Sequence, residues 1–195
     1  MRYTSKITAI VLSLLLLTAF NTELMAQYKV DSKSSTLSIF GTSSLHDWEI
    51  EANTLQGSAN FDVSEGIVKD INNLTFEVVV KSLKSGKSGM DNNTYDALEA
   101  KNHDKITFKL KEVNKITPLS GGKCKIEASG VLTIAGNARN VKMTVTADAS
   151  GSKVNIKGSY SMKMTSFDID PPTAVFGTIK TGDEVKIEFN VNYIK

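Results

Sequence analysis

The chain has 195 residues, of which 23 are Lys or Arg and 21 are Asp or Glu, so its net charge is +2 at pH 7. This balance gives no support for nucleic-acid binding, which needs a concentrated basic face, nor for attraction to an anionic membrane surface. The single cysteine, Cys124, excludes an intramolecular disulfide, so the fold must be held by the burial of apolar side chains.

The N-terminal segment 1–26 has the order of a secretory signal. Two basic residues precede an uncharged apolar run over 7–20, and small Ala26 ends the segment. The run is shorter than the roughly 20 residues of a transmembrane helix. We therefore expect a signal peptide cleaved near Ala26 and a periplasmic or secreted protein made of a single domain, 27–195. An uncleaved N-terminal anchor is the alternative.

After the signal, apolar and polar side chains alternate with a period of two, which is typical of strands with one buried face. In chain order the alternating segments are 36–41, 46–52, 57–63, 74–81, 106–111, 124–134, 141–146, 154–164 and 185–193. Turn-forming clusters such as Ala135-Gly136-Asn137 separate them and favour hairpins between antiparallel neighbours. The pattern predicts an all-β fold, an antiparallel barrel or sandwich of eight or nine strands.

Two segments interrupt the alternation. In 90–102, Asp91 or Asn92 could cap a helix start, which predicts a short helix of about two turns against one barrel end. The stretch 167–183 has no regular period. Pro171 and Pro172 within it cannot donate ladder hydrogen bonds, so we expect a loop or an edge crossing.

Strands with one apolar and one polar face can form two kinds of barrel. In one kind the apolar side chains point inward, and in an outer-membrane barrel they point outward to lipid. The alternating runs are mostly shorter than the roughly 9–11 residues of a membrane strand. One Trp and five Tyr are also too few for two aromatic girdles. These features favour the inward arrangement. A barrel of about eight strands is either filled by side chains or holds one small ligand, and the pattern leaves both alternatives open.

Several phrases resemble the YceI-like family, also called polyisoprenoid-binding periplasmic proteins. The phrases are Tyr28-Lys29-Val30-Asp31, Ser44-Leu45-His46-Asp47-Trp48, Gly130-Val131-Leu132-Thr133-Ile134-Ala135-Gly136, and the segments 85–108 and 176–189. The resemblance spans essentially all of 28–195. The resemblance implies a lipocalin-like antiparallel β-barrel of about eight strands with one short helix near an end, and a polyisoprenoid chain bound inside the barrel.

The inward-facing side chains are the candidate ligand-binding residues. We expect the barrel lining to include His46, Trp48, Ile50, Phe61, Phe76, Val78, Phe108, Leu110, Leu132, Met143, Tyr160, Met162 and Phe189. Lys84 and Lys87 stand in a Gly/Ser-rich loop and are candidates for contact with an anionic headgroup at the cavity mouth. A solvated loop is the alternative for these two lysines.

Catalytic residues are not expected. His46 and Asp47 are adjacent, so in a strand their side chains point to opposite faces. Two histidines and one cysteine make a poor zinc site. We therefore predict no catalytic residue, metal or cofactor.

The resulting hypothesis is an exported, non-enzymatic protein that carries or stores a long apolar molecule, an isoprenoid or another lipid. It predicts no nucleic-acid partner and no stable membrane insertion, and it leaves the oligomeric state open, a dimer included. One alternative is a solid-cored periplasmic interaction or stress protein that acts through its surface. The other is an enzyme on lipid-like substrates that uses His46 or the loop containing Asp168 and Asp170.

Overall fold

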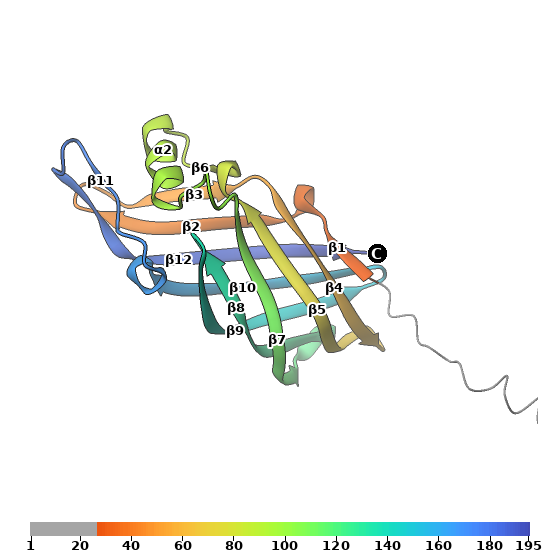
Figure 1. Cartoon of the computed structure of the whole chain (residues 1–195). Coiled ribbons are helices and arrows are strands. Elements are labelled where there is room, and N and C mark those ends of the chain that lie inside the picture. The colour runs from red at the N-terminus through yellow and green to blue at the C-terminus, as the bar shows by residue number, and fades with distance from the viewer. Residues whose placement is uncertain (1–26) are drawn as a thin grey trace, which may run out of the picture.

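A computed structural model describes residues 27–195 (Figure 1). The predicted signal peptide lies outside the described residues. The strands are β1 Gln27–Val30, β2 Thr36–Ser43, β3 Trp48–Ala52, β4 Leu55–Ser64, β5 Ile67–Val79, β6 Leu83–Lys84, β7 Lys105–Pro118, β8 Lys123–Ile134, β9 Asn137–Ser150, β10 Lys153–Lys163, β11 Thr173–Ala174 and β12 Ile179–Ile194. Within 27–195 the one α-helix is α2, Ser88–Ala97, and short 3-10 turns occupy Ser32–Ser34, Val80–Ser82, Ser120–Gly122 and Met164–Phe167.

The sheet closes on itself in the order β1-β4-β5-β7-β8-β9-β10-β12, because β1 pairs with both β4 and β12. The long strand β12 also pairs with β2, and β2 pairs with β3. Strands β1 and β2 follow one another along β12 and together occupy one position in the ring. Strands β4 and β3, which pair with β1 and β2, together occupy the next position. Every pairing is antiparallel, and closure leaves no long free strand edge in the ring. The predicted all-β antiparallel barrel with one helix is confirmed.

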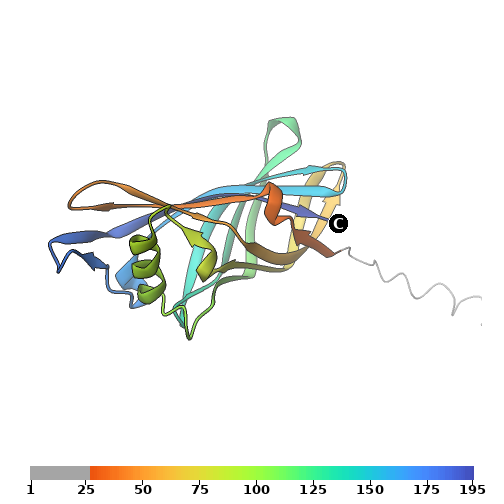
Figure 2. The same ribbon diagram turned by 90° about the horizontal axis from the view of Figure 1, so that it is seen from above.

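Helix α2 covers the end of the barrel where β5 ends and β7 begins (Figures 1 and 2). It begins earlier than predicted, at Ser88, and Asp91 is not its cap. The Asp91 carboxylate instead accepts hydrogen bonds from the backbone N–H and the hydroxyl of Ser85, at 2.8 and 2.7 Å. These bonds draw the preceding loop against the helix and lower the pKa of Asp91, with the Ser85 bonds as the largest cause.

The expectation of a loop over 167–183 is partly wrong. Strand β12 already begins at Ile179, and the two-residue strand β11 pairs with it in a small hairpin. The alternation was hidden because the pairing of β12 with β2 shifts register between Thr181 and Val185, which breaks the period of two. Pro171 and Pro172 lie outside the strands, as expected of residues without an N–H donor.

The barrel is solid at one end and hollow at the other. At the solid end, Phe61 packs edge-to-face with Tyr28 and Tyr193, at centroid distances of 5.2 and 5.3 Å. Buried Cys124 and Ile126 belong to the same cluster. Two further apolar clusters surround the other half, under α2 and around the start of β12. Within 27–195, no helix is long and apolar enough to cross a bilayer.

Candidate ligand-binding cavity

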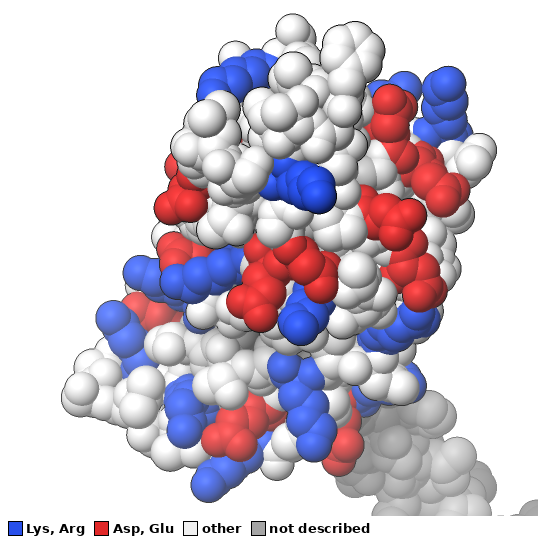
Figure 3. Space-filling view, turned by 90° about the vertical axis from the view of Figure 1, so that its left-hand side faces the viewer, with Lys and Arg blue, Asp and Glu red and all other residues white. Residues whose placement is uncertain are grey.

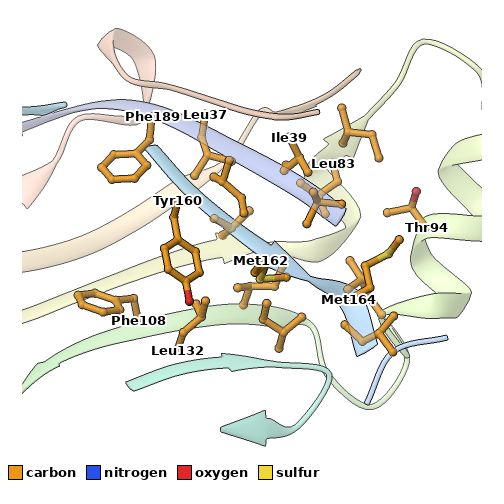
Figure 4. A pocket seen from close by; sticks show the side chains of 18 of the residues that line it. Leu37, Ile39, Leu83, Thr94, Phe108, Leu132, Tyr160, Met162, Met164 and Phe189 are labelled. Atoms are coloured by element: carbon orange, nitrogen blue, oxygen red, sulfur yellow. The ribbon is translucent and has the colours of Figure 1, made fainter. Parts of the chain in front are cut away.

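An elongated apolar cavity of about 360 Å³ occupies the hollow half of the barrel (Figure 4). This volume is far above the roughly 30 Å³ that one water takes up, so the cavity is not a packing defect. It falls within the roughly 300–1,000 Å³ typical of small-molecule sites. The cavity runs from the buried cluster of the solid end to a mouth bounded by α2, the β2–β3 loop and β11.

The strand period places the lining side chains. Along β12, alternate residues from Val185 to Tyr193 face the cavity, and the lysine and glutamate between them face outward. From Val185 to Tyr193 there are eight intervals of about 3.3 Å, which correspond to roughly 26 Å of strand. The site therefore has the shape of a long chain rather than of a compact molecule.

Glycines close to aromatic rings on neighbouring strands help to keep this space open. A Cβ on Gly158 would lie 2.9 Å from the Phe189 ring, and a Cβ on Gly130 would lie 2.5 Å from the Phe108 ring. Both rings therefore lie close to a glycine of a neighbouring strand, where a larger residue would force them to move. The large aromatic side chains thus line the cavity without filling it.

The structure brings together all but one of the predicted lining residues. Those that line the cavity are His46, Trp48, Ile50, Phe76, Val78, Phe108, Leu110, Leu132, Met143, Tyr160, Met162 and Phe189. Phe61 does not line it, because this residue lies at the solid end between Tyr28 and Tyr193. Phe61 has the same inward alternation as the others but a different depth along the barrel.

The two predicted headgroup lysines do not line the cavity. Lys84 Nζ donates a 2.7 Å hydrogen bond to the Tyr95 hydroxyl and lies 3.5 Å from the Asp91 carboxylate. The bond to Tyr95 is the largest cause of the raised pKa of Lys84. Lys87 directly precedes α2 and is exposed. Lys84 is therefore held to the helix by Tyr95 and Asp91.

Two parts of the lining were missed by the sequence analysis. One is the inner face of α2, with Met90, Asn93, Thr94, Ala97 and Leu98. Their spacing of three and four residues marks one helix face, and this signal was present in the sequence. The other is the mouth segment that contains Pro172, Thr173, Ile179 and Thr181, together with Leu45 of the β2–β3 loop. No local period marks these residues, because the β12 bulge intervenes.

Tyr160 supplies a polar group inside the otherwise apolar lumen. Its ring stands among Leu132, Met162 and Phe108, with its hydroxyl toward the cavity (Figure 4). Burial raises the pKa of Tyr160, so the hydroxyl stays neutral and can donate a hydrogen bond. None of the described residues hydrogen-bonds to this hydroxyl.

The candidate catalytic groups do not converge. His46 lines the mouth, but its Nδ1 lies 2.6 Å from the carbonyl of its neighbour Asp47. Asp168 forms a 2.7 Å ion pair with Arg139 and does not line the cavity, and neither does Asp170. Among residues 27–195, no three His, Cys, Asp or Glu side chains are grouped to hold a metal ion.

A closed antiparallel barrel around an elongated apolar cavity is a lipocalin-like barrel. Residues 28–193 match the model of the YceI-like domain, and the chain belongs to this family. The resemblance found in the sequence is thereby confirmed. A comparison with curated proteins gives no match.

Solved structures share the fold. Burkholderia cenocepacia BcnA has a TM-score of 0.66 at 23% identity, covering 84% of this chain and 98% of that chain. A polyisoprenoid binding domain from Saccharophagus degradans has a TM-score of 0.66 at 13% identity, covering 86% and 97%. The Campylobacter jejuni YceI protein has a TM-score of 0.60 at 17% identity, covering 75% and 84%. At these identities the likeness shows the fold alone.

Proposed function

We propose that this protein is a non-enzymatic carrier or store that holds one long apolar molecule, an isoprenoid or another lipid, inside the barrel. The observation that carries the proposal is the elongated cavity, whose lining is mainly apolar and comes from β2, β3, β5, β7, β8, β9, β10, β12 and α2. The structural neighbour described as a polyisoprenoid binding domain supports the same ligand class.

Burial alone supplies enough free energy for such binding. Each buried methylene contributes about 0.8 kcal/mol, so a five-carbon isoprene unit offers roughly 4 kcal/mol before costs. Association costs roughly 4–15 kcal/mol. A chain of about four units or more therefore binds usefully without a strong polar contact.

The positions of the polar side chains favour one orientation of the ligand along the cavity. The inner end of the cavity is formed by Ile126 and Val191, with Tyr193 beside them, whereas Asn93 and Thr181 lie near the mouth. An apolar tail is therefore favoured at the inner end, and any polar headgroup at the mouth, where water and side-chain partners are available.

Native mass spectrometry of protein purified from its own host tests this proposal. The expected result is a bound apolar molecule, and the emptied protein should take up geranylgeraniol, a prenyl alcohol of four isoprene units. Protein that is empty as isolated and takes up neither geranylgeraniol nor an isoprenoid quinone would refute it.

We propose in addition that the protein is exported. The support is the basic, apolar and small order of residues 1–26. The intact mass of the protein from a periplasmic or secreted fraction should correspond to a chain that begins near Gln27. A full-length chain found in the cytoplasm would contradict export without affecting the ligand proposal.

A further inference from the structure

Two loops meet beyond the cavity mouth, and we call residues 43–47 and 172–178 together the mouth rim. The Ser44 N–H donates a 2.9 Å hydrogen bond to the Lys180 carbonyl, and the Lys180 N–H donates a 3.1 Å hydrogen bond to Ser44 Oγ. The two loops are therefore tied together at their bases. Both project past α2 at the same end of the barrel (Figure 2).

The mouth rim presents apolar side chains to solvent. Leu45 is 67% exposed, Val175 is 62% exposed and Phe176 is fully exposed. Val175 and Phe176 have φ angles of 51° and 54°, in the left-handed region that bulky and β-branched residues rarely adopt. The Val175 carbonyl accepts hydrogen bonds from both the N–H and the hydroxyl of Thr178, at 3.1 and 2.6 Å, which hold this turn. The fold thus maintains a strained conformation that points Phe176 away from the protein.

Charged side chains are sparse on this surface. The stretch 171–179 contains none, and Asp47 is the one Asp, Glu, Lys or Arg in 43–47. In the view onto this end of the molecule, a mostly uncharged area occupies the upper part, with Lys or Arg groups at its edges and acidic groups beside it (Figure 3). An uncharged apolar tip can enter the interface of a bilayer without removing charges from water.

We propose that the mouth rim inserts into a zwitterionic lipid bilayer, so that the apolar ligand passes between bilayer and cavity without crossing water. This inference rests on the proposed function, because it concerns how that ligand enters. The rim is continuous with the cavity, since Leu45, His46 and Thr173 belong to both.

A bilayer fits this surface better than a protein partner does. A stable protein interface buries about 800 Å² on each side. An aromatic side chain buries roughly 150–250 Å², so three side chains on two narrow tips supply much less than such an interface needs. In a bilayer the tips require no complementary surface, and a long apolar ligand is itself concentrated there.

Tryptophan reporters at the two ends of the barrel test the insertion. The variants are Phe176→Trp at the rim and Leu119→Trp, a matched control, because Leu119 is also exposed but lies in the β7–β8 turn at the solid end. Both are made in the whole chain, so that residues 1–26 and Trp48 are common to them. The probe is a vesicle of brominated phosphatidylcholine without isoprenoid.

The expected result is a blue-shifted emission and at least twofold stronger quenching for Trp at position 176 than for Trp at position 119. Equal quenching at the two positions, or none at either, would overturn the proposal. A change at position 176 that follows protein concentration and needs no vesicles would indicate a second copy of the chain and would overturn it too.

Transfer kinetics separate this inference from the proposed function. The double variant Val175→Ser, Phe176→Ser should take up geranylgeraniol from phosphatidylcholine vesicles about tenfold or more slowly than the unaltered chain. Its equilibrium affinity for geranylgeraniol added from ethanol should be unchanged. Unchanged transfer with unchanged affinity would overturn membrane docking alone. Vesicle docking by a chain with no uptake from either source would overturn the proposed function instead.

Discussion

Replacing Val145 by Thr changes the polarity of the cavity wall and almost nothing else. Val145 lies on β9, is partly buried and lines the cavity between Ile126 and Gly158, its neighbours across the sheet. Threonine has nearly the same shape and volume, so the lumen keeps its size. Without ligand the new hydroxyl can be hydrated by water in the lumen. With an apolar chain bound, that water is displaced.

The expected loss follows from this desolvation. A hydroxyl buried without a partner costs about 1–3 kcal/mol on protein mutational scales. This cost corresponds to a dissociation constant for geranylgeraniol that is roughly 5- to 150-fold higher. The matched control is Thr144→Val, the reverse change at the neighbouring exposed position on the outer face. It should leave the affinity unchanged. Titration calorimetry gives both constants, and urea unfolding checks that the free energy of unfolding changes less than the free energy of binding. If Val145→Thr binds within twofold of the unaltered chain, the ligand does not contact the inner face of β9.

Three further predictions concern other parts of the barrel. Tyr160→Phe should bind squalene, a hydrocarbon without a polar group, about 1 kcal/mol more tightly, because it removes a hydroxyl that the bound chain would desolvate. Equal squalene affinities would show that the ligand leaves this hydroxyl hydrated. Phe61→Ala should lower the free energy of unfolding in urea by about 3–5 kcal/mol, while geranylgeraniol binding at a temperature where the variant is folded stays unchanged, because Phe61 packs in the solid end. A parallel loss of affinity would place Phe61 in the ligand site. The lowered pKa of Asp91 implies stability that is present above pH about 3.9 and is lost as the pH falls through the lowered value. Urea unfolding of Asp91→Asn between about pH 2.5 and 6 should therefore show a weaker loss of stability on acidification than the unaltered chain, and identical profiles would exclude this contribution.

The division into a solid and a hollow half explains how one barrel serves both stability and binding. The solid end buries Tyr28, Phe61 and Tyr193 against one another, so the fold does not depend on a ligand to fill its core. At the hollow end, Phe108 and Phe189 lie over glycines, so apolar surface remains available. The burial of a ligand can then contribute free energy to a barrel that is already folded and closed.

The strands and their inward faces could be predicted from the sequence because a period of two is a local property of the chain. The alternation over 124–134 and 185–193 alone indicates which side chains share a face, whatever the partner strands are. The helix was predicted for a similar reason, although its start was wrong, because Asp91 bonds to Ser85 rather than capping the helix.

The tertiary structure alone decided which inward residues meet a ligand cavity. Phe61 and Phe76 alternate in the same way along the sequence, yet Phe61 is packed in the solid end and Phe76 lines the cavity. The difference is depth along the barrel axis, which depends on the stagger of all the strands in the ring and not on any one segment. The mouth rim could not be predicted from the sequence either, because Ser44 and Lys180 are neighbours only through the pairing of β2 with β12.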